Sequence, residues 1–298
     1  MGEIAALLTS FCWAFSGIFF TAAGKKVGSL SVNRIRLMLA FVMFLLTHLI
    51  FEGSLIPLHA GKERWFWLSL SAISGLVISD TLLFQGFVLM GVRIPILITA
   101  TVPVISSMIA WIFLGEHLSP GVIAGIALTI SGISIVVLER GEGNLAANNR
   151  RSYALGILCA FGAAVGQATG LVLAKVGMAG DFSVLSTVTI RTVVGFVTIW
   201  GIAILTGSAG QTFQGMRRFP SSFRNTAIGT VIGPYTGVWL SMVAVQNTYV
   251  GIASTLMALS PIILLPIIKF GYKEYVSWRA VLGTILSIAG VTVIILIK

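Results

Sequence analysis

The sequence predicts an all-helical membrane protein in which ten transmembrane helices form two five-helix repeats, the second inverted relative to the first. Three observations support this fold class: the composition, the length of the uncharged runs and an internal repeat. The 298-residue chain is 57% hydrophobic and 9% charged, and its mean hydropathy is +1.01. Soluble domains contain about 25% charged residues, so the composition indicates a membrane protein.

Uncharged runs of bilayer-spanning length define the predicted helices. A transmembrane helix needs about 20 apolar residues, and residues 4–24 and 94–115 are examples of uncharged runs of this length. The stretch 225–268 carries no charge and is long enough for two helices and a tight turn. Because these runs lack the alternating polarity of barrel strands, we predict helices at 4–23, 32–51, 65–89, 94–114, 119–138, 153–174, 183–206, 226–246, 250–268 and 278–297.

The internal repeat has a constant offset of 158 residues and aligns residues 75–137 with 233–295. The two copies share residue types that rarely coincide by chance in apolar sequence, namely Gly75 with Gly233, Pro103 with Pro261, Glu116 with Glu274, Gly125 with Gly283 and Gly132 with Gly290. The earlier helices repeat more weakly, with Lys26 matching Lys175 and Arg36 matching Arg191. The chain is therefore predicted to be a duplication.

A polar linker at 139–152 divides the chain into a first repeat at 1–138 and a second at 153–298. Each half has five predicted spans. Because five is odd, the second half must enter the membrane from the opposite side. Transporters built from inverted repeats bind their solutes between the repeats, near the middle of the bilayer.

The net charge of +10 would suggest a nucleic-acid partner in a soluble protein. Here the cations lie at the ends of the predicted spans, so we expect membrane lipids and no nucleic acid as their partners. Basic residues crowd the face that carries the loops after the odd-numbered spans. The positive-inside rule places that face in the cytoplasm and both termini outside.

Asp80 is the acidic residue predicted to lie deepest in a span. An ionised carboxylate at the centre of a transmembrane helix costs roughly 2.5–3.5 kcal/mol, so it should face a cavity or a partner. Two interpretations are open. Asp80 could contact a substrate amine or carry a coupling proton, or it could form a structural ion pair with Arg36 or Arg191.

Arg36 and Arg191 are repeat partners that lie about one helical turn inside their predicted spans. Inversion would place them near opposite faces of the membrane, where each could attract an anionic group of the substrate or gate one side. Extension of the side chain to the lipid headgroups is the alternative, and we favour it for Arg36. Arg191 has no neighbouring cation in the sequence and is the better cavity candidate.

Three prolines fall inside predicted spans. Pro103 and Pro261 are repeat partners, and Pro234 lies in the eighth span. Each removes one backbone donor and is expected to kink its helix. We predict that these helices line or gate the cavity, with static kinks used for packing as the alternative.

Polar and aromatic side chains within the spans could bind a small, partly apolar solute. Tyr235 and Trp239 are four residues apart and share one helix face, while Gln85 and Gln167 add hydrogen-bonding capacity. Core packing and hydrogen bonds between helices are an equally good interpretation. Glycines spaced by four residues in spans six and eight predict close helix packing; they are Gly162, Gly166, Gly170, Gly229, Gly233 and Gly237.

Glu116 and Glu274 directly follow their spans, three residues before Ser119 and Ser277. We predict a structural role, in which each carboxylate caps the backbone donors at the start of the next helix. The two cysteines lie inside apolar runs and give neither a metal pattern nor a disulfide framework. No metal or cofactor is expected.

Several of these features resemble the EamA-type members of the drug/metabolite transporter superfamily. They are Trp13 in the first span, Arg36, Pro103, the segment LGEHLS at 114–119, Gly125 and Gly132. The second copy has Tyr-Lys-Glu at 272–274 where the family usually has Leu-Gly-Glu. The resemblance implies a secondary transporter, often an exporter of amino acids or other small metabolites, with a central cavity and cytoplasmic termini. The charge distribution favours the opposite orientation.

The predicted function is therefore secondary transport, without ATP, of a small metabolite such as an amino acid, and export is the expected direction. The expected location is the plasma membrane, with protons as a candidate coupling ion and either a monomer or a homodimer as the assembly. A multidrug or lipid-intermediate flippase is the alternative. An enzyme is not expected, because the chain has no Ser/His dyad, no paired membrane aspartates and no ATP-binding sequence.

Overall fold

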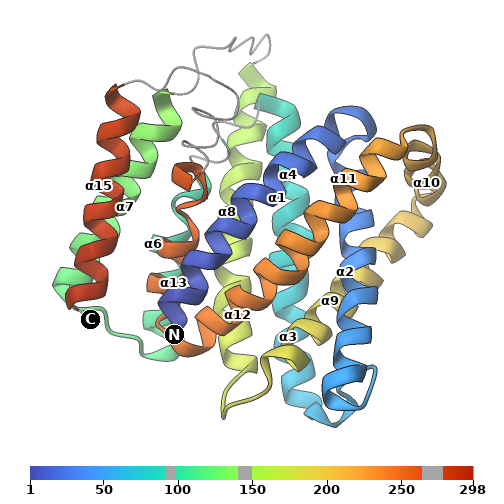
Figure 1. The fold of residues 1–298 in the computed structure, drawn as a ribbon, viewed down its shortest axis with the longest axis horizontal. Helices are drawn as coiled ribbons and strands as arrows, with labels where there is room; N and C mark the ends of the chain where they lie inside the picture. Colours follow the sequence, from blue (N-terminus) through green and yellow to red (C-terminus); the bar gives the residue numbers. More distant parts are fainter. Residues whose placement is uncertain (91–94, 96–97, 140–149, 264–277, 298) are drawn as a thin grey trace.

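The computed structural model describes residues 1–90, 95, 98–139, 150–263 and 278–297, and the helices in these ranges form one bundle (Figure 1). Within these ranges, six helical segments are long and apolar enough to cross a membrane: Gly2–Val27, Ser29–Glu52, Lys62–Gly86, Ser152–Gly177, Val184–Leu205 and Pro220–Asn247. Four shorter apolar segments are Val102–Leu114, Pro120–Ile135, Val250–Ile263 and Val281–Ile297. These segments overlap all the predicted helix ranges, and the all-helical class is confirmed.

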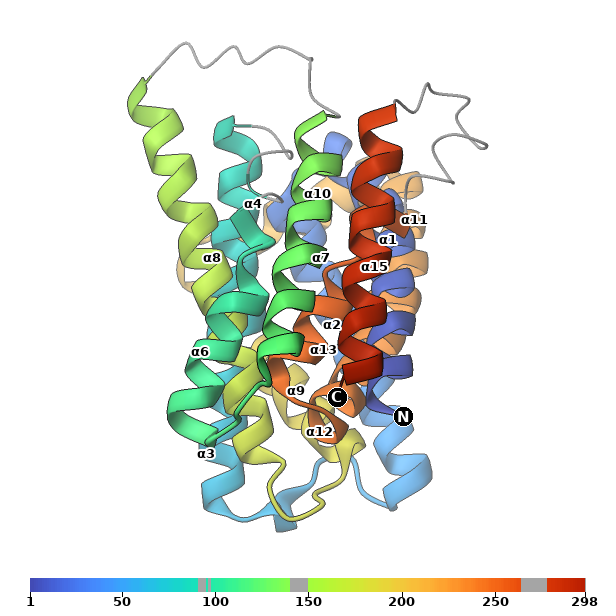
Figure 2. The same cartoon turned by 90° about the vertical axis from the view of Figure 1, so that its left-hand side faces the viewer.

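The helices of the first half are α1 (Gly2–Val27), α2 (Ser29–Glu52), α3 (Lys62–Ala72), α4 (Ser79–Met90), α6 (Val102–Leu114) and α7 (Pro120–Glu139). A short 3₁₀ turn, η1 (Leu58–Ala60), precedes α3, and a π-helical turn, η2 (Ile73–Ile78), joins α3 to α4. Figure 2 shows both chain ends at one end of the bundle, which we call the terminus-bearing end, whereas α7 finishes at the opposite end.

The second half contains α8 (Arg150–Gly177), α9 (Val184–Leu205), α10 (Ala209–Arg218), α11 (Pro220–Thr230), α12 (Val238–Asn247), α13 (Val250–Met257) and α15 (Trp278–Ile297). A second π-helical turn, η3 (Val231–Gly237), joins α11 to α12. The half begins at the end where α7 finishes and returns to the terminus-bearing end (Figure 2).

The two halves pack by exchanging equivalent contacts. Helix α1 packs along α11, η3 and α12, which form the third apolar segment of the second half. Helix α8, the first of the second half, packs in the same way along α3, η2 and α4. Helices α2 and α9 contact each other, and α6 contacts α13. Each half therefore buries its apolar faces mainly against the other, as expected of stacked repeats.

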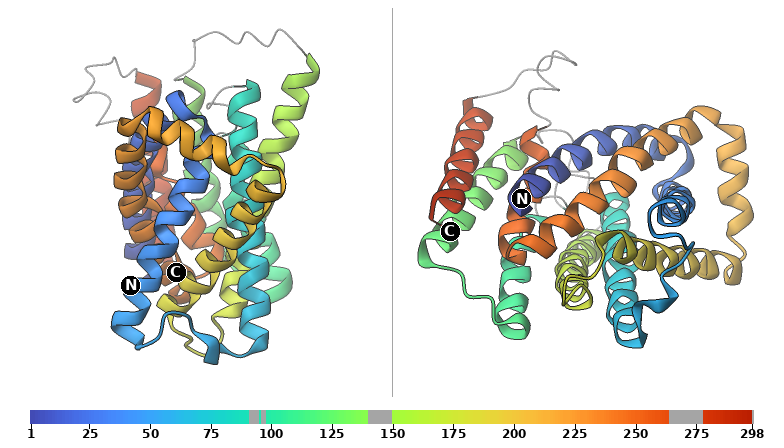
Figure 3. Two further views of the ribbon diagram at one scale, coloured as in Figure 1. Left: turned by 90° about the vertical axis from the view of Figure 1, so that its right-hand side faces the viewer. Right: turned by 60° about the horizontal axis from the view of Figure 1, so that its bottom comes forward.

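Helices α7 and α15 form an antiparallel pair at one edge of the bundle (Figure 3). Small residues at the repeated positions allow their backbones to approach closely. A side chain at Gly132 would collide with Ser287 and the Gly283 carbonyl, and one at Gly290 would collide with Thr129. Close approach through small residues is a common way for membrane helices to associate.

Two kinds of departure from regular helix recur at the repeat offset. The π-helical turns begin at residues 73 and 231, which differ by the repeat offset of 158. Two-residue turns at 100–101 and 258–259 interrupt the fourth and ninth predicted spans at the same offset. Short π-helical turns inside helices are frequent at functional sites and produce kinks.

These interruptions change the predicted roles of the prolines. Pro103 lies in the first turn of α6, where its missing N–H would have no helical partner anyway. Pro261 follows the turn at 258–259. The continuous kinked helices predicted at 94–114 and 250–268 are therefore wrong for their described parts, because the backbone turns before each proline. Pro234 lies inside η3 and does accompany an irregular helix.

Two further differences concern helix ends. The positive φ of Gly28 (81°) lets the chain leave α1 and start α2 at Ser29, three residues earlier than predicted. Helix α10 was not predicted, because a short amphipathic helix lacks a long apolar run. Arg34 anchors it by donating hydrogen bonds to Ser208 and to the hydroxyl of Thr212, at 3.0 Å for the latter.

Candidate functional site

A charged cluster formed by Arg36, Asp80 and Arg191 lies inside the bundle. Asp80 follows η2 in the first turn of α4, and Nη2 of Arg36 on α2 forms an ion pair with its Oδ2. The exposed fractions of the two side chains are only 14% and 21%. Of the two roles predicted for Asp80, the ion pair with Arg36 is present in this structure.

The guanidinium of Arg36 is held on several sides. Its Nε donates a hydrogen bond of 2.7 Å to Oδ1 of Asn33, one turn earlier on α2. The rings of Phe20 and Phe84 lie 5.9 and 5.8 Å from its central carbon, within the range of cation–π attraction. Arg36 therefore does not extend to the lipid headgroups, and that preferred interpretation is wrong.

Arg191 enters the cluster from α9 in the second half. Its exposed fraction is 4%. Nη1 lies 2.7 Å from the sulfur of Met242 on α12, and the charge of Asp80 acts on the guanidinium. Its buried Nε has no hydrogen-bond partner among the described residues. Arg191 thus lacks a carboxylate of its own.

The expected separation of the two arginines toward opposite faces is also incorrect. Arg36 is seven residues from the start of α2, and Arg191 is seven residues from the start of α9. At 1.5 Å per residue, each lies about 10 Å inside its helix, which is about a third of the hydrocarbon thickness. The two helices enter from opposite ends of the bundle (Figure 1). Asp80 lies between them, where its charge acts on both guanidinium groups, but of the two arginines only Arg36 forms an ion pair with it.

Three serines, Ser71, Ser74 and Ser79, fix the helical segment that carries Asp80. Their hydroxyls donate hydrogen bonds to backbone carbonyls of α8 at 2.5–2.9 Å, the acceptors being Gly170, Gly166 and Ala163. The five-residue step from Ser74 to Ser79 keeps both hydroxyls on one face because the π-helical turn adds a residue to the helix. Tight packing against α8 thereby orients the first turn of α4.

An aromatic wall of Phe44, Tyr235 and Trp239 lies near the cluster. The ring centroids of Phe44 are 4.8 Å from Tyr235 and 6.3 Å from Trp239, and the Tyr235 hydroxyl lies 2.6 Å from the hydroxyl of Thr47. Trp239 and Met242 are three residues apart on α12 and so share a face. The wall therefore continues toward Arg191 through Met242.

The remaining candidate side chains have different surroundings. Trp13 is half-buried on α1 and packs beside Gly237. Gly237 lies between Tyr235 and Trp239 in the sequence. Gln85 is exposed on α4 and Gln167 is half-buried on α8. Among the described residues, no hydrogen bond links either amide to the charged cluster.

A second ionic contact, which we call the end latch, joins the halves at the terminus-bearing end. Oε1 of Glu116 lies 2.5 Å from Nζ of Lys175, and Oε2 accepts a hydrogen bond of 2.8 Å from the backbone of Val250. Lys175 also donates to the carbonyl of Thr248 at 2.6 Å. Glu116 is 8% exposed.

The predicted cap is thus placed on a different helix. Glu116 caps the start of α13 in the other half, whereas the hydroxyl of Ser119 accepts the backbone hydrogen bond at the start of α7. No sequence signal identified Val250 as the partner, because the contact spans the two halves. Glu274, the repeat partner, lies outside the described residues.

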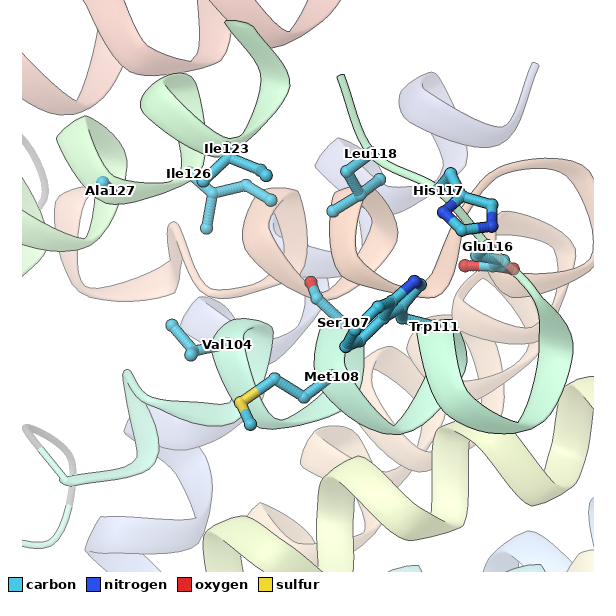
Figure 4. A pocket seen from close by; sticks show the side chains of 10 residues that line it. All are labelled: Val104, Ser107, Met108, Trp111, Glu116, His117, Leu118, Ile123, Ile126 and Ala127. Atoms are coloured by element: carbon cyan, nitrogen blue, oxygen red, sulfur yellow. The ribbon is translucent and has the colours of Figure 1, made fainter. Parts of the chain in front are cut away.

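A pocket of about 470 Å³ lies in the first half, between α6 and α7 (Figure 4). Its lining is mostly apolar and comprises Val104, Ser107, Met108, Trp111, Glu116, His117, Leu118, Ile123, Ile126 and Ala127. It adjoins the end latch through Glu116 and contains no member of the charged cluster. Across the described residues, no group of three acidic, histidine or cysteine side chains could hold a metal ion.

Comparisons with known proteins agree on the fold. One solved protein structure matches 99% of this chain and 96% of its own length with a TM-score of 0.78 at 15% sequence identity. Twenty-nine chains of solved structures match significantly. No curated protein sequence matches at that level.

The family model for the EamA-like transporter family matches residues 1–138 and again residues 154–296. The two matched segments together cover nearly the whole chain, and they confirm the resemblance inferred from the sequence. The protein is thus a multi-pass membrane transporter of small molecules within the drug/metabolite transporter superfamily. The chain belongs to the EamA-like transporter family.

Proposed function

We propose that the protein is a secondary transporter that exports a small metabolite, such as an amino acid, across the plasma membrane without ATP. All ten apolar segments cross the bilayer in this proposal, and the halves at 1–138 and 153–298 are inverted repeats. The observation that carries the proposal is the charged cluster, because α2 and α4 of one half and α9 of the other supply its members. Ionisable groups placed deep in a membrane usually mark a transport path.

Alternating access would proceed by rocking of the two halves around this cluster. The halves contact each other through equivalent surfaces, and both third segments contain a π-helical turn beside the interface. In this mechanism the end latch closes the terminus-bearing end and must open when the solute leaves or enters there. Protons are a candidate coupling ion through Asp80, whose pairing with Arg36 would respond to protonation.

Flux into proteoliposomes tests the proposal. Purified protein should accumulate labelled small metabolites against empty vesicles, and the D80N variant should lose most of this flux while the exposed-site variant R217Q retains it. The panel contains amino acids and organic acids, each tested with and without a pH gradient. Absence of uptake by both the wild-type protein and R217Q would contradict the transporter proposal.

The pocket between α6 and α7 favours a second candidate, a flippase for drugs or lipid intermediates. Met108 and Trp111 line this pocket and are more than half exposed on α6. A flippase would pass its substrate along this apolar surface. W111A should then abolish movement of a fluorescent lipid, whereas the transporter mechanism predicts that W111A leaves metabolite flux within about twofold of wild type because single rim contacts contribute little.

A further inference from the structure

We propose that the solute binds Arg191 through a carboxylate, carries a net charge of −1 and has an apolar or aromatic body. This inference rests on the proposed function. It narrows the substrate from small metabolites in general to organic monocarboxylates, which replace the amino acid given there as an example.

Arg191 is a buried cation that contacts no carboxylate directly among the described residues. It is 4% exposed, its Nε has no partner among the described residues, and Nη1 meets only the thioether of Met242. A sulfur is a weak acceptor. A buried charge that is left unpaired is strongly destabilising, so this site would be stabilised by a ligand that supplies the missing negative charge.

The net charge of the cluster favours a monoanion. Arg36 and Asp80 neutralise each other in a direct ion pair, which leaves the cluster with the single positive charge of Arg191. A monoanion restores neutrality, whereas a zwitterion leaves the positive charge and an amine doubles it. Among the described residues, the carboxylate of Glu116 is also buried, but Lys175 engages it in the end latch. An ammonium group would therefore find no free carboxylate at this site among the described residues.

The guanidinium of Arg191 and its surroundings match a carboxylate on an apolar body. An arginine presents parallel N–H donors that match the two oxygens of a carboxylate. On the η2 side, Gly75 has no side chain, and a Cβ there would already lie 3.5 Å from Nη2. On the other side, Met242 leads to Trp239 and the rest of the aromatic wall. These neighbours suit an apolar body attached to the carboxylate.

A matched set of three probes tests the charge of the solute. Phenylpyruvate (−1), phenylalanine (0) and phenethylamine (+1) share one aromatic body and differ in net charge. Binding is measured by tryptophan fluorescence in nanodiscs, and flux is measured in proteoliposomes against empty vesicles. We expect phenylpyruvate to bind and to be transported best, and R191Q to weaken its binding by roughly tenfold to a hundredfold, the range for a lost charge-assisted hydrogen bond.

Two further variants separate charge from folding. R191K retains the cation and should recover part of the phenylpyruvate binding that R191Q loses. R217Q removes a cation from the exposed end of α10 and should bind like wild type. Their size-exclusion profiles show whether each variant is folded.

The results separate the substrate class from the transporter function. Flux of phenylalanine or phenethylamine above that of phenylpyruvate, or phenylpyruvate binding unchanged in R191Q, overturns the substrate class and leaves the transporter function intact. Absence of binding and flux for all three probes in the wild-type protein contradicts the inference, and the wider metabolite panel then decides the transporter function separately.

Discussion

The hydroxyl of Ser287 donates a 3.2 Å hydrogen bond to the backbone carbonyl of Thr129, the residue that occupies the same position in the first repeat. A residue touches its own equivalent only where a two-fold axis passes between them. The internal symmetry therefore runs through the α7–α15 contact. Small side chains at this contact are required by geometry.

Enlarging Gly132 should break the α7–α15 pair. The added side chain of G132V would collide with Ser287 and with the Gly283 carbonyl, and overpacking of this kind costs about 1–3 kcal/mol. The midpoint of thermal unfolding should fall by several degrees. It is measured by size-exclusion chromatography of samples that have been heated. Gly17 provides a matched control because nothing lies within 4 Å of its Cβ position. Equal midpoints for G17V and G132V would refute this contact.

Removing one member of the buried ion pair should destabilise the protein more than removing both. D80N leaves the Arg36 guanidinium without its carboxylate, and breaking a buried pair costs about 3–5 kcal/mol. The double variant D80N/R36Q should recover part of the lost thermal stability. A double-mutant cycle measures the coupling directly. Additive effects of the two substitutions would show that the pair does not contribute as a unit.

The same Asp80 variant tests proton coupling. If Asp80 carries the coupling proton, flux by D80N should lose its dependence on an imposed pH gradient and retain only downhill exchange. The measurement is uptake with the gradient in each direction and without it. Wild-type pH dependence in D80N would remove Asp80 from the coupling mechanism.

A covalent bond in place of the end latch should stop transport. In a background with Cys12 and Cys159 replaced by alanine, E116C/K175C can be oxidised across the two halves, since the native side chains meet at 2.5 Å. We expect oxidation to arrest flux and a reductant to restore it. The two single-cysteine variants, treated with the same oxidant, are the controls. Full flux in the cross-linked protein would mean that this end does not open.

The location of the chain ends is a prediction from charge alone. Both ends lie at the same end of the bundle (Figure 1), and the basic residues crowd the loops at the other end. A reporter that is active only outside the cell should therefore work when fused to Lys298 and fail when fused after residue 139. The reverse pattern would place the termini in the cytoplasm.

Much of the fold could be predicted from the sequence. Long apolar runs identify the helices, and rare residues repeated at one offset identify the duplication. Gly75, Pro103 and Glu116 mark the duplication even though apolar sequence is degenerate. The short helix α10 could not be found in this way, since its signal is an amphipathic pattern over only ten residues.

The composition of the site could be predicted better than its geometry. Asp80 and Arg191 were identified because charges are costly in a bilayer. Their meeting with Arg36 depends on where α2 and α9 begin and on how they are rotated, and neither is fixed by local sequence. The contact of Glu116 with Val250 crosses the two halves, so only the packed structure reveals it.

Paired distances at the two ends of the bundle test the central claim, rocking of two inverted halves, most directly. Spin labels would be placed at Leu58 and Ala179 near the terminus-bearing end, and at Lys25 and Arg224 near the opposite end, all of them exposed. The E116Q substitution weakens the end latch. We expect the Leu58–Ala179 distance to be longer in E116Q than in wild type, and the Lys25–Arg224 distance to be shorter. Lengthening at both ends, or no change at either, would contradict the account.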